Sequence, residues 1–176
     1  TEPVAVAYAG AVSKKYLTGT IDNIVIIVSK NIFKNGKSVI IPNTNEWGLD
    51  LAGALGVIGG NSDNCLMVLK NIDDDTIETA HRMIKDGKIK VDFVEKTPDI
   101  FVNIVVKSSK ELVEVVLANN HTHIEWVKVD GEIVIEKSLD KEDKISADFL
   151  KKMTFKKIRE ICETIPFEEL KFIEEG

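Results

Sequence analysis

The sequence predicts an α+β fold, in which a mostly antiparallel sheet carries its helices on one face. Three observations support this: a helix-spaced segment leads into a continuous apolar strand, a glycine-rich helical stretch follows, and four strand-like runs then come in succession. Strands that follow one another without intervening helices favour antiparallel pairing. We therefore expect a sheet domain over residues 20–138, an N-terminal helix before it and short helices at the C-terminal end.

The composition is that of a soluble globular protein. Of its 176 residues, 44% are hydrophobic and 30% are charged, with a net charge of −6. No apolar run approaches the roughly 20 residues of a membrane helix, so we expect a cytoplasmic protein without a membrane partner. Lysines interleaved with acidic residues argue against nucleic acid, because phosphate binding favours clustered cations. A small anionic or zwitterionic ligand remains compatible with this charge.

The first elements follow from periodicity. Residues 2–15 place apolar side chains at helical spacing, with Pro3 where the first turn tolerates it. Residues 21–29 form a continuous apolar run, typical of a strand covered on both faces. Asn35-Gly36 and Pro42-Asn43 then predict turns around a short strand at 38–41.

The middle of the chain predicts three helices and the main sheet. The glycine-rich stretch 49–59 has a helical period, and its glycines indicate close packing. Polar residues at 61–63 cap a short helix at 64–70, and three aspartates at 73–75 favour the start of a helix that ends at Gly87. The expected strands are 88–94, 100–107, 111–118 and 124–137, the last broken into a hairpin at Asp130-Gly131.

The C-terminal part divides from the sheet domain at a charged linker, residues 138–144. Two short helices are expected after it, at 155–165 and 166–174. The predicted organisation is thus an N-terminal helix (1–19), the sheet domain (20–138) and a linker with the start of a helical region (139–176).

Several short segments carry a resemblance to known proteins. They are Thr1-Glu2-Pro3 with the small apolar residues after it, SKNIFKNG at 29–36, IPNT at 41–44 with WGL at 47–49, AGALGVIGG at 52–60, and NNHTHI at 119–124. In this order and with similar gaps they resemble the L-cysteine desulfidase and iron–sulfur serine dehydratase-like family (serine dehydratase alpha-type). The resemblance covers residues 1–131, and Lys30 stands where the family has glycine.

The resemblance implies a lyase that eliminates sulfide or water from L-cysteine or L-serine. It also implies a [4Fe–4S] cluster in the full-length protein, with one ligand in a Cys directly before the position of Thr1. On this view the chain is an N-terminal-to-central fragment, followed in the family by an all-helical catalytic half that residues 139–176 would begin. We expect no cluster and no elimination activity on the fragment alone.

The candidate site residues come from the same segments. Glu2 and His121 are the candidate catalytic residues, and Thr1, Asn31, Lys34, Asn35 and Thr122 are the candidate substrate-binding residues. A carboxylate at Glu2 can orient an amine or act as a base. Lysine and asparagine side chains can bind a carboxylate from a loop at a strand end.

Structural explanations compete with each of these roles. Glu2 in a first turn stabilises a helix, and Thr1 can serve as its N-cap. Residues 29–36 can be a solvated hairpin that turns at Asn35-Gly36. The glycine-rich segment 52–60 can cradle an anion or simply pack closely on the sheet.

Metal binding has little support in the sequence. His121 and His123 would face the same side of a strand, but no third ligand accompanies them. Cys65 and Cys162 lie far apart, so we interpret them as free thiols in a reducing compartment and expect no metal site in this chain.

Two classes of function therefore remain. The first is a portion of an iron–sulfur-dependent amino-acid lyase. The second is a non-catalytic domain that binds a small molecule such as an amino acid, or that serves assembly. The Ala/Gly-rich first helix could drive homo-oligomer formation.

Overall fold

The computed structural model describes residues 1–137 and 153–171. The chain forms two compact units, Thr1–Leu139 and Asp140–Gly176. The first unit contains the N-terminal helix together with the sheet. The charged linker expected at 138–144 lies outside the described residues.

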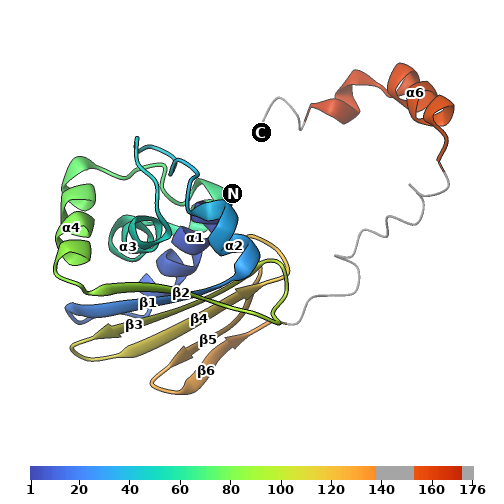
Figure 1. Cartoon of the computed structure of the whole chain (residues 1–176). Coiled ribbons are helices and arrows are strands. Elements are labelled where there is room, and N and C mark those ends of the chain that lie inside the picture. The colour runs from blue at the N-terminus through green and yellow to red at the C-terminus, as the bar shows by residue number, and fades with distance from the viewer. Residues whose placement is uncertain (138–152, 172–176) are drawn as a thin grey trace. The chain divides into compact units, whose positions relative to one another are not determined.

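The sheet confirms the predicted fold class. In the described residues it has six strands in the order β2-β1-β3-β4-β5-β6. All neighbouring strands pair antiparallel except β1 and β2, which are parallel. The helices of this unit lie on one face of the sheet (Figure 1). The strands are β1 (Ile21–Ser29), β2 (Ile89–Val94), β3 (Phe101–Ser108), β4 (Leu112–Ala118), β5 (Ile124–Val129) and β6 (Glu132–Glu136).

Strand β1 is covered on one face rather than on both, which corrects the expectation from its apolar run. Ile24, Ile26 and Val28 are buried beneath the helices, whereas Val25 and Ile27 point to the other face and are partly exposed. Residues of a strand alternate between faces. The apolar run is continuous because the face of β1 that the helices do not cover also carries apolar side chains.

Helices α1 (Glu2–Lys14) and α3 (Leu49–Gly59) have nearly the predicted bounds and pack very closely. A Cβ atom on Gly56 would overlap the backbone carbonyl of Ala7, and one on Gly10 would lie 2.9 Å from the Gly53 carbonyl oxygen. Glycine is required at these positions because the two backbones approach without side chains between them. The glycines of 49–59 thus have a packing role.

Two further elements of the helical layer are capped as their sequences predict. The side chain of Asn61 accepts a hydrogen bond from the Asp63 N–H at the start of η1 (Ser62–Met67), a 3₁₀ helix. Asp73 accepts one from the Thr76 N–H, 2.9 Å away, at the start of α4 (Asp74–Lys85). These side chains satisfy N–H groups that a helix start leaves unpaired.

The turn predicted at Asn35-Gly36, the strand predicted at 38–41 and the alternative of a hairpin at 29–36 are wrong. Residues Lys30–Gly36 form a helix, α2, and the segment predicted as a strand contributes an isolated bridge between Ile40 and Trp47. The Ser29 side chain accepts a hydrogen bond from the Ile32 N–H and so caps the helix, and Ile32 is fully buried. Capping and burial thus outweigh the turn tendency of Asn35-Gly36.

The second unit contains helix α6 (Phe155–Thr164) and the 3₁₀ turn η3 (Phe167–Leu170). Thr154 caps α6 by accepting a hydrogen bond from the Lys157 N–H. The first expected tail helix is therefore confirmed, and the second is shorter than expected within the described residues. In both units, none of the described helices combines the length and the apolar character needed to cross a membrane.

A polar cluster around Glu111 joins the α1–β1 connection to the β3–β4 hairpin. Its carboxylate accepts hydrogen bonds from the Ser108 hydroxyl at 2.6 Å, from the Thr18 hydroxyl, and from the N–H groups of Thr18 and Gly19 at 3.2 and 3.3 Å. The bonds from Ser108 and Thr18 lower the pKa of Glu111 to about 2. Hydrogen bonds that favour the charged form have this effect.

This cluster predicts a pH-dependent loss of stability. Because the folded-state pKa of Glu111 lies below its ordinary value of 4.5, its contribution is present above that pH and is lost as the pH falls toward 2. We expect Glu111→Gln to lower the melting temperature at pH 7, with a difference from wild type that shrinks between pH 4.5 and 2. The exposed Glu132→Gln serves as a control, and a pH-independent difference would contradict the cluster's role.

The α1–α3 contact predicts a strong effect of one added methyl group. Gly56→Ala should destabilise the protein by roughly 1–3 kcal/mol, because the Ala7 carbonyl cannot move without separating two helices. Gly59→Ala in the same helix is the matched control. Its new methyl group would meet the ends of the Thr76 and Ile72 side chains, at 2.7 and 2.8 Å, which can rotate away. Urea unfolding of both variants measures the difference, and equal stabilities would refute this contact.

Candidate functional site

Glu2, at the start of α1, lies next to the end of α2. A Cβ atom on Gly36 would lie 3.4 Å from the Glu2 Cβ and 2.5 Å from a methyl group of Leu49. The starts of α1 and α3 therefore meet the end of α2. Thr1 precedes α1, but its side chain makes no capping hydrogen bond and instead lies 3.3 Å from the Glu2 carboxylate.

The Glu2 carboxylate accepts hydrogen bonds at the start of α1. Partial burial raises the pKa of Glu2, whereas hydrogen bonds from its own N–H and from the Thr1 hydroxyl lower it. An ionised carboxylate at this position can attract an ammonium group.

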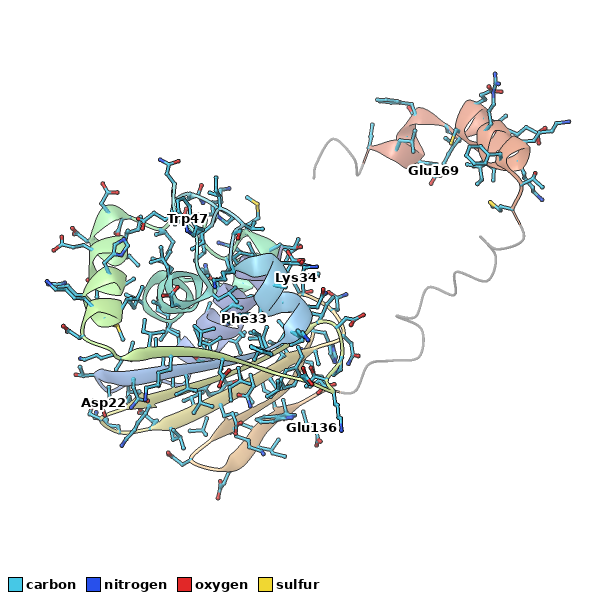
Figure 2. The ribbon with its side chains drawn as sticks, viewed as in Figure 1. Asp22, Phe33, Lys34, Trp47, Glu136 and Glu169 are labelled. Carbon is cyan, nitrogen blue, oxygen red and sulfur yellow. The ribbon has the colours of Figure 1, made fainter. Side chains whose placement is uncertain are left out.

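Asn31, Lys34 and Asn35 share one exposed face of α2. The Asn35 amide donates a hydrogen bond to the Asn31 side-chain oxygen over 3.3 Å, as the spacing of four residues in a helix allows. Figure 2 shows Lys34 on one side of α2, and Phe33 lies between the helix and the sheet. Three side chains that can donate hydrogen bonds to a carboxylate are thus presented together.

The start of α2 and the β4–β5 turn lie at the same end of the sheet. The Ser29 hydroxyl donates a hydrogen bond to the Asp99 carbonyl oxygen over 2.6 Å, and the Asn119 N–H donates one to the neighbouring Ile100 carbonyl oxygen over 2.9 Å. β3 separates the two strands that lead to these residues, which places them about 10 Å apart at ordinary strand spacing. The two predicted substrate-binding loops are therefore neighbours.

His121 and His123 lie in the β4–β5 turn, ahead of the strand that begins at Ile124. The expectation that His121 and His123 face the same side of a strand is therefore wrong. Among the residues that the structure describes, the Nε2 atoms of both histidines are buried without a hydrogen-bond partner. Thr122 is fixed in the same turn by its N–H, which donates to the Asn120 side-chain oxygen over 3.2 Å.

An open pocket of about 350 Å³ is present at this end of the sheet. It is lined by Ser29, Lys30 and Asn31 and by residues 94–99. Lys30, which stands at the family's glycine position, pairs with Glu95 at 3.4 Å on its rim. Asn31 thus faces a pocket, whereas His121 and Thr122 are placed near it by the strand order and do not line it.

A second groove was missed by sequence reasoning. Its volume is about 530 Å³, and it lies between α2, the start of α3 and β2. The exposed Trp47 beside Gly48 is the signal that could have found it, because an exposed tryptophan often marks a binding surface. Its lining residues are Phe33, Lys37, Trp47, Gly48, Leu49, Asp50, Ile89 and Val91.

The described residues do not supply a metal or cluster site. They contain no group of three or more His, Cys, Asp or Glu side chains that could hold a metal ion. Cys65 and Cys162 are both exposed and lie in different units. An iron–sulfur cluster needs more thiolates than these two positions could bring together.

The chain is similar in sequence to proteins named UPF0597. It is 48% identical to a UPF0597 protein of Clostridium botulinum, 33% to one of Clostridium tetani and 31% to one of Actinobacillus pleuropneumoniae, each over the whole chain. No protein-family model matches the chain. No solved structure matches it either. The chain spans 41% of the length of the Clostridium botulinum relative. From end to end, the chain is therefore homologous to about two fifths of a UPF0597 protein.

Proposed function

We propose that the chain is the substrate-binding portion of an amino-acid lyase that eliminates sulfide or water from L-cysteine or L-serine. The observation that carries the proposal is the placement of two family-like segments, 29–36 and 119–124, at one end of the sheet through the Ser29–Asp99 and Asn119–Ile100 hydrogen bonds. The motif resemblance supplies the reaction class. A cytoplasmic setting belongs to the same proposal.

In this proposal, different residues bind the two charged groups of the substrate. Asn31, Lys34 and Asn35 offer amide and ammonium donors to its carboxylate from one face of α2. The carboxylate of Glu2, beside the end of α2, attracts its ammonium group. An amino acid held by both groups has a fixed orientation at its α-carbon, as an elimination requires.

His121 is the base in this proposal. Elimination removes the α-proton and breaks the bond from the β-carbon to sulfur or oxygen, which leaves aminoacrylate and hydrogen sulfide or water; aminoacrylate then hydrolyses to pyruvate and ammonia. An imidazole is well suited to take a proton near neutral pH. The Nε2 atom of His121 is buried and has no hydrogen-bond partner among the described residues, so its hydrogen-bonding capacity is unused in this structure.

The cluster belongs to polypeptide outside this chain, because the described residues do not fit it. The residues of this chain bind and orient the amino acid and accept its proton.

The alternative is a binding or assembly domain without chemistry of its own. The open pocket beside Asn31 and the lack of cluster ligands among the described residues are compatible with it. Pyruvate and sulfide release from L-cysteine, measured on the anaerobically purified polypeptide at the full length of its relatives, separates the two. Product formation supports the lyase, and binding of L-cysteine without turnover supports the alternative.

The role of His121 gives a direct prediction. In the longer protein, His121→Gln should lower kcat by roughly 10²–10⁴-fold, the usual contribution of a general base, while the melting temperature stays unchanged. His81→Gln is the matched control, because His81 lies on α4 and pairs with Glu46 at 3.0 Å, away from this end of the sheet. An unchanged kcat in His121→Gln would make this histidine structural.

The role of Lys34 gives a different kinetic signature. Lys34→Met should raise KM by roughly tenfold or more and leave kcat within a few-fold, because loss of a carboxylate contact weakens substrate binding. Lys85→Met, at the end of α4, is the control for loss of one surface cation. A kcat effect without a KM effect would remove Lys34 from the substrate-binding set.

A further inference from the structure

The groove between α2, α3 and β2 is separate from the proposed lyase site. It uses Phe33 and Lys37 of the α2 region, whereas Asn31 and Asn35 lie on another face of the same helix and Lys34 lies one turn before Lys37. Figure 2 shows Phe33 and Lys34 on different sides of α2. The groove's chemistry can therefore be considered independently of the lyase proposal.

The floor of the groove is apolar and its aromatic wall is fixed. Leu49, Ile89 and Val91 line it, and the Phe33 ring packs on Phe93 with a centroid separation of 5.0 Å. Trp47 adds a second aromatic side chain with 65% of its surface exposed. Apolar and aromatic lining with a few polar groups is characteristic of small-molecule sites, and a volume of about 530 Å³ can accommodate a large amino acid.

The groove also carries one charge of each sign. The Lys37 ammonium lies 5.8 Å from the centre of the Phe33 ring, and no ion pair joins it to a residue that the structure describes. Asp50 is held by the Leu51 N–H, which donates to one of its oxygens over 2.9 Å. Gly48 has a φ of 121°, and a Cβ atom there would lie 2.5 Å from that oxygen, so glycine leaves room for the carboxylate.

We propose that this groove is a second site, which binds a zwitterionic amino acid with a large apolar side chain. Lys37 binds the ligand carboxylate and Asp50 its ammonium group, while Phe33, Trp47 and the apolar floor hold the side chain. Opposite charges beside an apolar groove favour a ligand with both charges over a simple acid or amine. This ligand is larger and more apolar than the substrates proposed for the lyase site.

The test is a titration of the full 176-residue chain with L-phenylalanine. Trp126→Phe leaves Trp47 as the fluorescence reporter, since the chain has 2 tryptophans. We expect a saturable change in Trp47 fluorescence, and calorimetry on the wild-type chain should give the same dissociation constant. L-alanine, 3-phenylpropanoate and phenethylamine each lack one feature, so each should bind at least tenfold more weakly.

Two charge variants and a matched control complete the test. Lys37→Met and Asp50→Asn should each weaken L-phenylalanine binding by at least tenfold while the chain stays folded; asparagine keeps an acceptor for the Leu51 N–H. Lys90→Met on β2, whose strand position faces the other side of the sheet from Ile89 and Val91, should bind normally. Absence of saturable binding, or equal affinity in the charge variants, would overturn the proposal. Lyase activity does not enter this test, so the two proposals fail separately.

Discussion

The close contact between α1 and α3 is the constraint on which the rest of the structure depends. Gly10, Gly53 and Gly56 let the two backbones approach, and Gly53 also leaves space for the Ile26 side chain from the sheet. Dispersion and apolar burial act over the whole contact when no side chain separates the elements. The position of both helix starts, and therefore of Glu2 and Leu49, follows from this contact.

Helix α2 depends on that contact at its end and on the sheet at its start. Gly36 lies against Glu2 and Leu49, while Ser29 caps the helix and also holds the Asp99 carbonyl. A helix of seven residues has little stability of its own, so both ends must be fixed by tertiary contacts. The polar face with Asn31 and the aromatic face with Phe33 thus have defined directions.

Much of the fold was predictable because its signals are local. The strand-like apolar runs of β3 and β4, the caps at Asn61 and Asp73 and the turn at Asp130-Gly131 all act within a few residues. The helix at Lys30–Gly36 was not predicted, because its cap works together with the long-range burial of Ile32. The parallel pairing of β2 with β1 likewise depends on the route of the chain through α3 and α4, which periodicity does not report.

The sequence predicted which residues belong to the candidate site, but it did not predict which of them lie close together. The motifs named Asn31, Lys34 and His121, but their proximity depends on β3 lying between β1 and β4, a property of strand order. The groove at Phe33 and Trp47 has no contiguous motif, because its lining comes from α2, the start of α3 and β2. Because α2 carries residues of both proposed sites, it is the element through which occupancy of one site would affect the other. A displacement of Phe33 by a ligand would act on the same short helix that presents Lys34, and coupling between sites requires such a shared element.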